Sequence, residues 1–215
     1  MKMKNKFKLI VSSVIVLLPI LFGVILWDAL PDQIATHWGP SGEPDAWSSK
    51  ASAVFLMPAF LLVLHLICIF ATSSDKMNRN QSFKLMGLMY WLVPAVSLAV
   101  NGLTYATALG KEIDAMSVLP IVMGVLFLLI GNYLPKCAQN RTIGIRIKWT
   151  LEDEENWNAT HRLSGKAWVI GALIILASVF LPTVLAWWIT IGVTLVMALV
   201  PIIYSYCFYK SKNGK

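Results

Sequence analysis

The chain has 215 residues, of which 57% are hydrophobic and only 13% are charged. A soluble domain usually carries about 25% charged residues, so this composition excludes an ordinary soluble globular domain. The net charge of +7 is also found in nucleic-acid-binding proteins. The positions of the basic residues, given below, argue against direct binding of nucleic acid.

Long apolar runs with almost no charge recur along the chain, each long enough to cross a hydrocarbon core about 30 Å thick. The runs are continuous rather than alternating, and helices satisfy their own backbone hydrogen bonds within lipid. Pro182 divides the last run, because proline interrupts a helix. The sequence therefore predicts an all-α integral membrane protein with about six transmembrane helices, at roughly residues 8–27, 51–71, 84–108, 117–135, 164–181 and 184–208.

The basic residues gather on one predicted side of the membrane. Four lie within residues 2–8, three within residues 76–84, six within residues 136–166 and three at the C-terminus. Only Lys50 and Lys111 fall on the other side. By the positive-inside rule, this distribution predicts that both termini lie in the cytoplasm. The net charge then reflects topology and contact with anionic membrane lipid.

Two units are predicted. Residues 1–83 form a two-span unit with an ordered outer loop, residues 28–50, and residues 84–215 form a four-span unit with a structured inner loop, residues 136–166. Within the first unit, His65 lies in a span and is expected to stay neutral and to hydrogen-bond a neighbouring helix. No cofactor is predicted.

The outer loop combines aromatic and acidic residues with turn-forming ones. Glycine and proline at positions 39–44 predict tight turns, and the loop is expected to fold onto the helices. A single imidazole, that of His37, with scattered carboxylates is a poor zinc ligand set, so no metal site is predicted. An acidic, aromatic outer surface suits a cationic or amphipathic peptide. The candidate residues for this binding are His37, Trp38, Asp45 and Trp47.

The inner loop begins with an alternating pattern. From Thr142 to Leu151, apolar residues occupy every second position, which predicts an extended segment with one apolar and one basic face. Such a segment lies along the membrane surface or pairs with a partner.

A short helix is predicted next, over about residues 151–163. Thr150 and Asp153 have a spacing similar to that of a capping box, and the acidic residues that follow favour a helix N-terminus. Trp157 and His161, four residues apart, share a face of this helix. Two interpretations of the inner loop remain open: a packed loop that braces the neighbouring helices, and a functional surface.

Two stretches resemble a known family. The first, which resembles the small domain of unknown function that often precedes this family, comprises Leu30, Pro31, His37, Trp38, Gly42, Asp45 and Lys50. The second resembles the signature of the SdpI immunity family and comprises Gly131, Asn132, Pro135, Asn140, Gly144, Arg146, Trp149, Thr150, Leu151, Trp157 and Arg162. With the six-span topology, the resemblance covers nearly the whole chain. One departure is the pair Ile147-Lys148, where the family commonly has Thr-Pro.

The resemblance implies a multi-pass protein of the bacterial cell membrane that confers immunity to a secreted, sporulation-delaying-type peptide toxin. It also implies that some members sense the toxin and recruit a winged-helix repressor to the membrane. The outer-loop candidates would then bind toxin. The inner-loop candidates for binding a partner are Asn140, Gly144, Arg146, Trp149, Thr150, Trp157 and Arg162.

Other classes of function are less well supported by the sequence. No nucleophile–base pair, metal ligand set or phosphate-binding glycine loop is visible, so an enzyme is not predicted. The alternative is a small multi-span transporter or efflux protein, although such carriers normally place Asp, Glu or Arg at mid-membrane depth. A purely structural membrane subunit is a third interpretation.

Overall fold

The computed structural model describes residues 3–75, 81, 83–111, 113 and 115–214. Of the predicted cytoplasmic basic residues, Lys2, Lys76, Arg79 and Lys215 lie outside the described residues. The chain forms two compact units, one of residues Met1–Phe70 with Gly87–Leu119 and the other of residues Ala71–Met86 with Pro120–Lys215. The division into residues 1–83 and 84–215 concerns sequence segments and stays a prediction.

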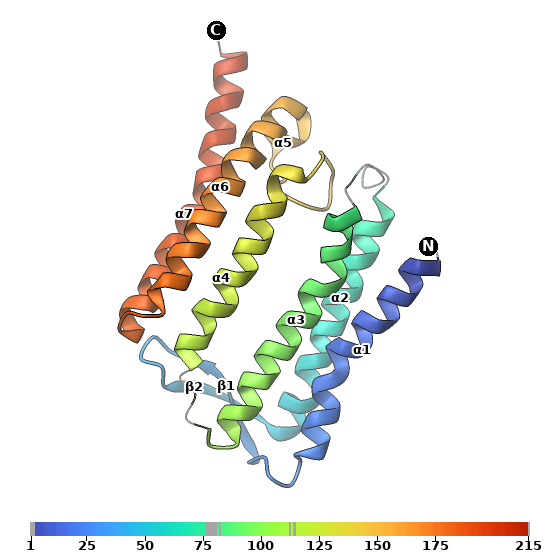
Figure 1. Ribbon diagram of the computed structural model, residues 1–215, viewed down its shortest axis with the longest axis vertical. Helices are drawn as coiled ribbons and strands as arrows, with labels where there is room; N and C mark the ends of the chain where they lie inside the picture. The colour runs from blue at the N-terminus through green and yellow to red at the C-terminus, as the bar shows by residue number, and fades with distance from the viewer. Residues whose placement is uncertain (1–2, 76–80, 82, 112, 114, 215) are drawn as a thin grey trace. The chain divides into compact units, whose positions relative to one another are not determined.

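Helices dominate the described chain, which confirms an all-α membrane protein (Figure 1). The long helices are α1 (Met3–Ile25), α2 (Met57–Ser74, preceded by the π-helical turn η1, Ser52–Leu56), α3 (Phe83–Ala108), α4 (Ala115–Tyr133), α6 (Glu154–Ser178) and α7 (Thr183–Asn213). Among the described residues, five segments are long and apolar enough to cross a membrane: Asn5–Ile25, Ser52–Ser74, Leu85–Ala108, Ser117–Lys136 and Thr183–Asn213.

These five segments correspond to five of the six predicted spans. The remaining predicted span, residues 164–181, falls on α6, whose first half is polar and charged and whose apolar part is therefore short. The helical break predicted at Pro182 is confirmed, because α6 ends at Ser178 and α7 begins at Thr183. The count of six spans and the cytoplasmic location of both termini stay predictions.

In the first unit, the outer loop forms a β-hairpin that the sequence did not predict. Strand β1 (Gln33–Trp38) pairs antiparallel with β2 (Pro44–Ser49). The predicted turns are confirmed: Gly39 N–H donates to the Glu43 carbonyl at 2.9 Å, and Gly42 has a φ of +86°, a conformation that favours glycine.

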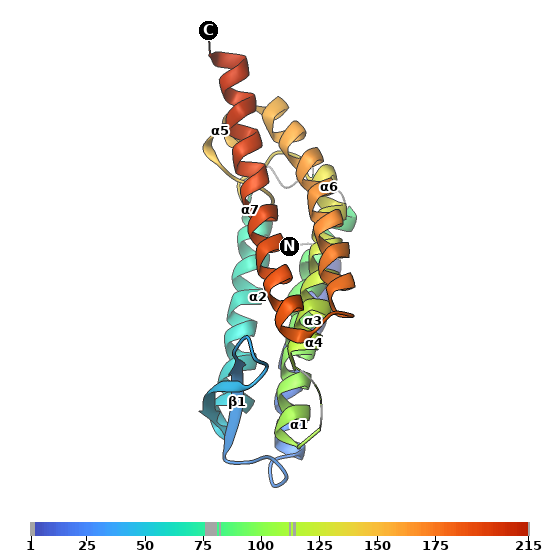
Figure 2. The same cartoon turned by 90° about the vertical axis from the view of Figure 1, so that its left-hand side faces the viewer.

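The hairpin packs onto the helix ends of its own unit. Leu30 and Ile34 are buried against Ala53 and Val54 in η1 and against Tyr105 near the end of α3. Figures 1 and 2 both place the hairpin beside the first turns of α2. The hairpin is thereby fixed at one end of this unit.

Buried hydrogen bonds join α1 to its neighbours. His65 Nε2 lies 2.8 Å from Ser12 Oγ, which confirms the predicted link between His65 and a neighbouring helix. Ser97 Oγ donates to the Val16 carbonyl at 2.9 Å. Because lipid offers polar groups no partner, such bonds specify which helix faces meet.

The second unit is built around α4, α6 and α7, with two short helices in the inner loop, η3 (Leu134–Lys136) and α5 (Lys148–Glu152). Asn156 on α6 donates to the Ser205 carbonyl on α7 at 2.9 Å, and Ser205 Oγ donates back to Asn156 Oδ1 at 2.8 Å. Both residues are fully buried. This reciprocal pair fixes α6 against the C-terminal half of α7.

Candidate functional site

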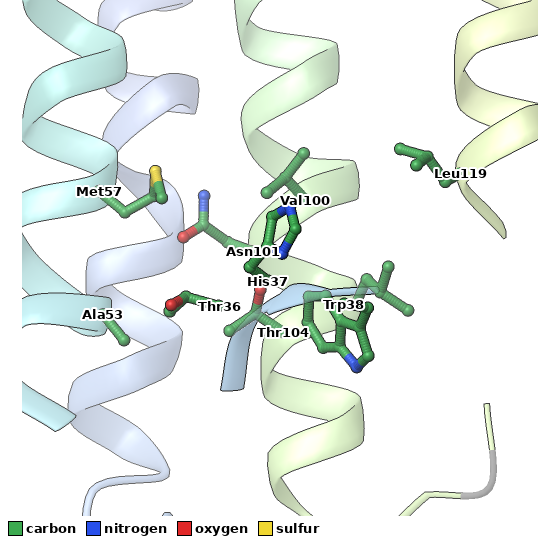
Figure 3. A pocket seen from close by; sticks show the side chains of 10 residues that line it. Thr36, His37, Trp38, Ala53, Met57, Val100, Asn101, Thr104 and Leu119 are labelled. Carbon is green, nitrogen blue, oxygen red and sulfur yellow. The ribbon is translucent and has the colours of Figure 1, made fainter. Parts of the chain in front are cut away.

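The hairpin and the helices beside it enclose a cavity of about 220 Å³. Its walls are mostly apolar, with a few polar groups from the hairpin and from α3 (Figure 3). A cavity of this kind accepts an apolar group and orients it by a small number of polar contacts. The lining residues are Thr36, His37, Trp38, Ala53, Met57, Val100, Asn101, Leu103, Thr104 and Leu119.

The structure brings three of the four outer-loop candidates together. His37 and Trp38 line the cavity, and Asp45 on β2 lies 2.5 Å from His37, measured from Oδ1 to Nδ1. Trp47 does not line the cavity, and it is 57% exposed. The polar lining residues Thr36, Asn101 and Thr104 were not identified from the sequence.

Acidic groups dominate the hairpin and the segment before it. Lys50 forms an ion pair with Asp32, Nζ to Oδ1 at 3.4 Å, and donates to the Trp27 carbonyl at 3.0 Å. Glu43 and Asp45 carry further negative charge on the hairpin. The surface around the cavity therefore favours a positively charged ligand.

In the inner loop, Asn140 shapes a turn of the backbone. Its side-chain oxygen accepts from the N–H groups of Thr142 and Ile143, at 2.8 and 2.6 Å. Its amide nitrogen donates to the carbonyls of Ala138 and Ile143, both at 2.9 Å. Asn140 is fully buried, so its amide stabilises this loop rather than offering a surface.

Trp157, His161 and Gly144 form the centre of the inner loop. The Trp157 and His161 rings stack with centroids 4.0 Å apart, which confirms that they share a helix face. Trp157 Nε1 donates to the Cys137 carbonyl at 2.8 Å. Gly144 has a φ of +101°, and a Cβ at this position would overlap His161 Nε2. Only glycine fits here.

Thr150 closes the turn that begins α5. Its hydroxyl accepts from the Ile147 N–H at 3.1 Å and lies 2.7 Å from the Ile145 carbonyl, to which it donates. The extended segment predicted over residues 142–151 is therefore wrong: the backbone bends over residues 141–144, Gly144 has a positive φ, and α5 begins at Lys148. The alternation of apolar residues continues to Leu151, but the hydrogen bonds of the Thr150 hydroxyl favour a helical turn that begins at Lys148.

The predicted helix over residues 151–163 is also wrong in its bounds. The chain breaks at Asp153, whose side chain accepts from the Glu155 N–H at 2.9 Å and so caps α6 itself. Thr150 takes no part in that cap. From Glu154 the helix continues without interruption to Ser178, which joins the inner loop directly to the apolar part of α6.

Three of the inner-loop candidates lie toward the surface. Arg146 is exposed and donates from Nη1 to the Arg141 carbonyl at 2.8 Å. Trp149 is half-buried, with its ring centroid 5.0 Å from that of Tyr206. Arg162 is exposed and lines a shallow polar pocket. The candidate set thus divides into residues that build the loop, namely Asn140, Gly144, Thr150 and Trp157, and residues available to a partner, namely Arg146, Trp149 and Arg162.

The inner loop should lose stability as the pH falls. Burial lowers the pKa of His161 to about 4 from an ordinary value of 6.5, and Nε2 must stay unprotonated to accept from the Ile145 N–H at 3.0 Å. In the unfolded chain this histidine takes up a proton below about pH 6.5, whereas in the folded chain it does so only near pH 4. The stability is therefore complete above pH 6.5 and declines toward pH 4.

Thermal unfolding of the detergent-solubilised protein, followed by tryptophan fluorescence, would measure this decline. We expect the melting temperature to fall between about pH 7 and about pH 5. In the His161→Gln variant we expect a lower melting temperature with a smaller pH dependence. An equal pH dependence in the variant would assign the effect to other groups.

Several helices that are long and apolar enough to cross a membrane are typical of a multi-pass membrane protein. Residues 136–205 match the SdpI/YfhL protein family, and residues 14–62 match a domain of unknown function (DUF1648). The resemblance to the SdpI family is thereby confirmed, and the chain is a multi-pass protein of the bacterial membrane.

A curated relative extends this similarity to nearly the whole chain. The chain is 29% identical over 208 residues to the Immunity protein SdpI of Bacillus subtilis (strain 168), an alignment that covers 96% of this chain and 98% of that protein. No solved structure matches the chain. The match to the SdpI/YfhL family contains the inner loop, and the match to the domain of unknown function contains the outer hairpin.

Proposed function

We propose that the chain protects a bacterial cell from a secreted, membrane-active peptide toxin. The observation that carries this proposal is the similarity to the Immunity protein SdpI, which extends over 96% of the chain. Because the alignment is of nearly full length, the similarity includes the predicted spans and both loops and is not limited to a single motif. The proposed protection needs a binding site for the toxin and no catalytic group.

The outer hairpin is the toxin-binding region in this proposal. The cavity beside His37 and Trp38 has mostly apolar walls, and Glu43 and Asp45 place negative charge near it. A toxin that inserts into membranes carries apolar side chains, and many such peptides are also cationic. The cavity and its acidic surroundings suit both properties.

Expression of the chain in a bacterium that is sensitive to a sporulation-delaying-type peptide toxin would test immunity. Cells that produce the protein should survive toxin concentrations that kill cells carrying an empty vector. Equal killing of both strains, with the protein shown to be present in the membrane, would refute the proposed function.

Changes in the outer cavity should weaken protection while leaving the protein in the membrane. Trp38→Ala removes an apolar wall, and Asp45→Asn removes a charge with little change of shape. We expect each variant to lower the protective toxin concentration about tenfold, equivalent to about 1.4 kcal/mol of binding free energy. The measurement is survival against toxin dose, normalised to the amount of membrane protein.

Matched controls are available elsewhere in the chain. Trp188 is 58% exposed on α7, and Glu152 is exposed at the end of α5. Trp188→Ala and Glu152→Gln should therefore retain protection. If these controls lose as much protection as the cavity variants, general damage to the protein explains the result, and the outer cavity is not the toxin site.

The proposal includes a second role, in which toxin-bound protein recruits a cytoplasmic repressor through the inner loop. Arg146 and Arg162 are exposed basic side chains on this loop, and Trp149 offers a partly exposed aromatic ring. Arginine and tryptophan are enriched among the residues that dominate protein–protein binding energies.

Loss of Arg146 should separate signalling from protection. Arg146→Ala should lower the membrane-bound fraction of a winged-helix repressor severalfold, because binding hot spots typically contribute at least about 1 kcal/mol. Survival in toxin should stay unchanged. The measurement is the fraction of a fluorescent repressor at the membrane, with Lys210→Ala as a control for loss of one exposed positive charge. Unchanged recruitment in Arg146→Ala would remove Arg146 from the partner surface.

A further inference from the structure

A groove of about 430 Å³ runs between the end of α4 and the middle of α6. The two helices come close here because both carry glycine: a Cβ on Gly131 would lie 2.9 Å from Trp168 Cβ, and a Cβ on Gly165 would overlap the Pro135 ring. Larger residues at these two positions would push the helices apart, so the glycines fix the width of the groove. No residue that lines the hairpin cavity lines this groove, and neither do Arg146, Trp149 or Arg162.

One end of the groove is cationic. Lys136 and Lys166 line it from opposite helices, and both are exposed. Lys136 Nζ donates to Asn132 Oδ1 at 3.2 Å and lies 5.2 Å from the Tyr133 ring centroid. Arg162, one helical turn before Lys166, adds a third positive charge nearby.

Carboxylates are also present close to this cationic end. Glu154 and Glu155 line the neighbouring polar pocket together with Arg162. Glu155 is paired with Lys212, Oε2 to Nζ at 2.9 Å. Neither carboxylate lines the groove itself, so the charge within the groove is positive.

The other end of the groove is apolar and faces outward. Val169 and Ile170 line it, and Ile170 is 59% exposed. Because a helix rises 1.5 Å per residue, Ile170 lies about 6 Å farther along α6 than Lys166. Lys136 is the last residue of a membrane-length segment, Ser117–Lys136. The lysines thus mark the level of the lipid headgroups, and Ile170 lies toward the hydrocarbon.

We propose that this groove binds one anionic phospholipid, with its phosphate between Lys136 and Lys166 and an acyl chain along Val169 and Ile170. Basic pockets between transmembrane helices favour anionic lipid headgroups in this way. A soluble anion would use only the cationic end, whereas a phospholipid also covers the exposed apolar surface. The site is separate from toxin binding and does not depend on immunity.

Native mass spectrometry of the full-length protein in a neutral detergent would test the site. The probes are dioleoyl phosphatidylglycerol, dioleoyl phosphatidylcholine and the soluble anion sn-glycerol 1-phosphate. We expect the protein to retain one phosphatidylglycerol molecule with at least about tenfold preference over phosphatidylcholine. Glycerol phosphate at the same concentration should not displace it.

Charge variants assign the binding to the groove. The double variant Lys136→Gln/Lys166→Gln should lose the preference, and Lys136→Arg/Lys166→Arg should keep it. Lys148→Gln/Lys210→Gln removes two other exposed basic residues of the same unit and should have no effect. Because all four lysines are exposed, the variants should melt at the same temperature as the natural chain.

A variant within the apolar half tests the acyl chain. Ile170→Asn should weaken retention of phosphatidylglycerol while leaving both lysines in place. Several results would overturn the proposal: equal retention of the two lipids, full retention by Lys136→Gln/Lys166→Gln, equal loss in the control double variant, or displacement by glycerol phosphate.

Discussion

Replacement of Gly144 by alanine should abolish the structure of the inner loop. Gly144 adopts a φ of +101°, which costs a residue with a side chain of order 1–3 kcal/mol. The added Cβ would also overlap His161 Nε2, the atom that accepts the hydrogen bond from the Ile145 N–H. We expect a destabilisation of at least about 2 kcal/mol and loss of both protection and repressor recruitment.

A second glycine provides the control for this change. Gly192 lies within α7, and a Cβ there would meet nothing within 4 Å. Gly192→Ala should therefore keep or slightly raise stability, since alanine favours a helix more than glycine does. Thermal melting in detergent and the survival assay measure both variants. A Gly144→Ala protein that melts like the natural chain would refute the role assigned to this backbone position.

Substitution of Trp157 should also cause a large loss of stability. Two substitutions at this position distinguish the contribution of its packing from that of its hydrogen bond to the Cys137 carbonyl. Trp157 is fully buried and contacts Leu85 and Cys137. Trp157→Ala should destabilise the second unit by about 3–5 kcal/mol through the cavity that it leaves. Trp157→Phe keeps an aromatic ring to stack on His161 but leaves the Cys137 carbonyl unpaired, at a cost of about 1–3 kcal/mol.

The order of stabilities is the test: natural chain, then Trp157→Phe, then Trp157→Ala. Thermal melting of the purified variants measures it, and Trp188→Ala on the exposed face of α7 should melt like the natural chain. If the phenylalanine and alanine variants are equally unstable, the hydrogen bond to Cys137 and not the packing dominates. If neither variant is destabilised, Trp157 has no structural role in the loop.

The division of the inner-loop motif has a consequence for mutational studies. Asn140, Gly144, Thr150 and Trp157 hold the loop together through bonds and contacts with its backbone, so their substitution removes every activity that needs the loop. Arg146 and Arg162 are exposed and bear on partner binding with less effect on folding. A scan that scores only loss of function would identify the first group and misassign it to partner contact.

Features encoded within a short segment could be predicted from the sequence. Five membrane-length helices follow from apolar runs, because the hydrophobic length requirement acts on each segment alone. The break at Pro182 and the turn at residues 39–44 are likewise local. The shared face of Trp157 and His161 follows from helical spacing, and the family motif identified the residues that build the inner loop.

Features that depend on distant residues could not be predicted. The hairpin exists because Ile34 packs against Val54 and Tyr105, which lie far away in the sequence. In the inner loop, the period-two pattern predicted an extended segment, whereas hydrogen bonds to Thr150 favour α5. The cavity beside His37 required residues of β1, α2 and α3 to meet, and no spacing within any one of them encodes that meeting.

Helix α7 is long enough to cross the membrane and also to reach the inner loop. Its 31 residues span about 46 Å at 1.5 Å per residue, which exceeds a hydrocarbon core of about 30 Å. The projecting end contacts Trp149 through Tyr206 and Tyr209, and Lys212 pairs with Asp153. A change in the tilt of this projecting end would shift or break its contacts with Trp149 and Asp153, so lipid thickness acts on the inner loop through these contacts.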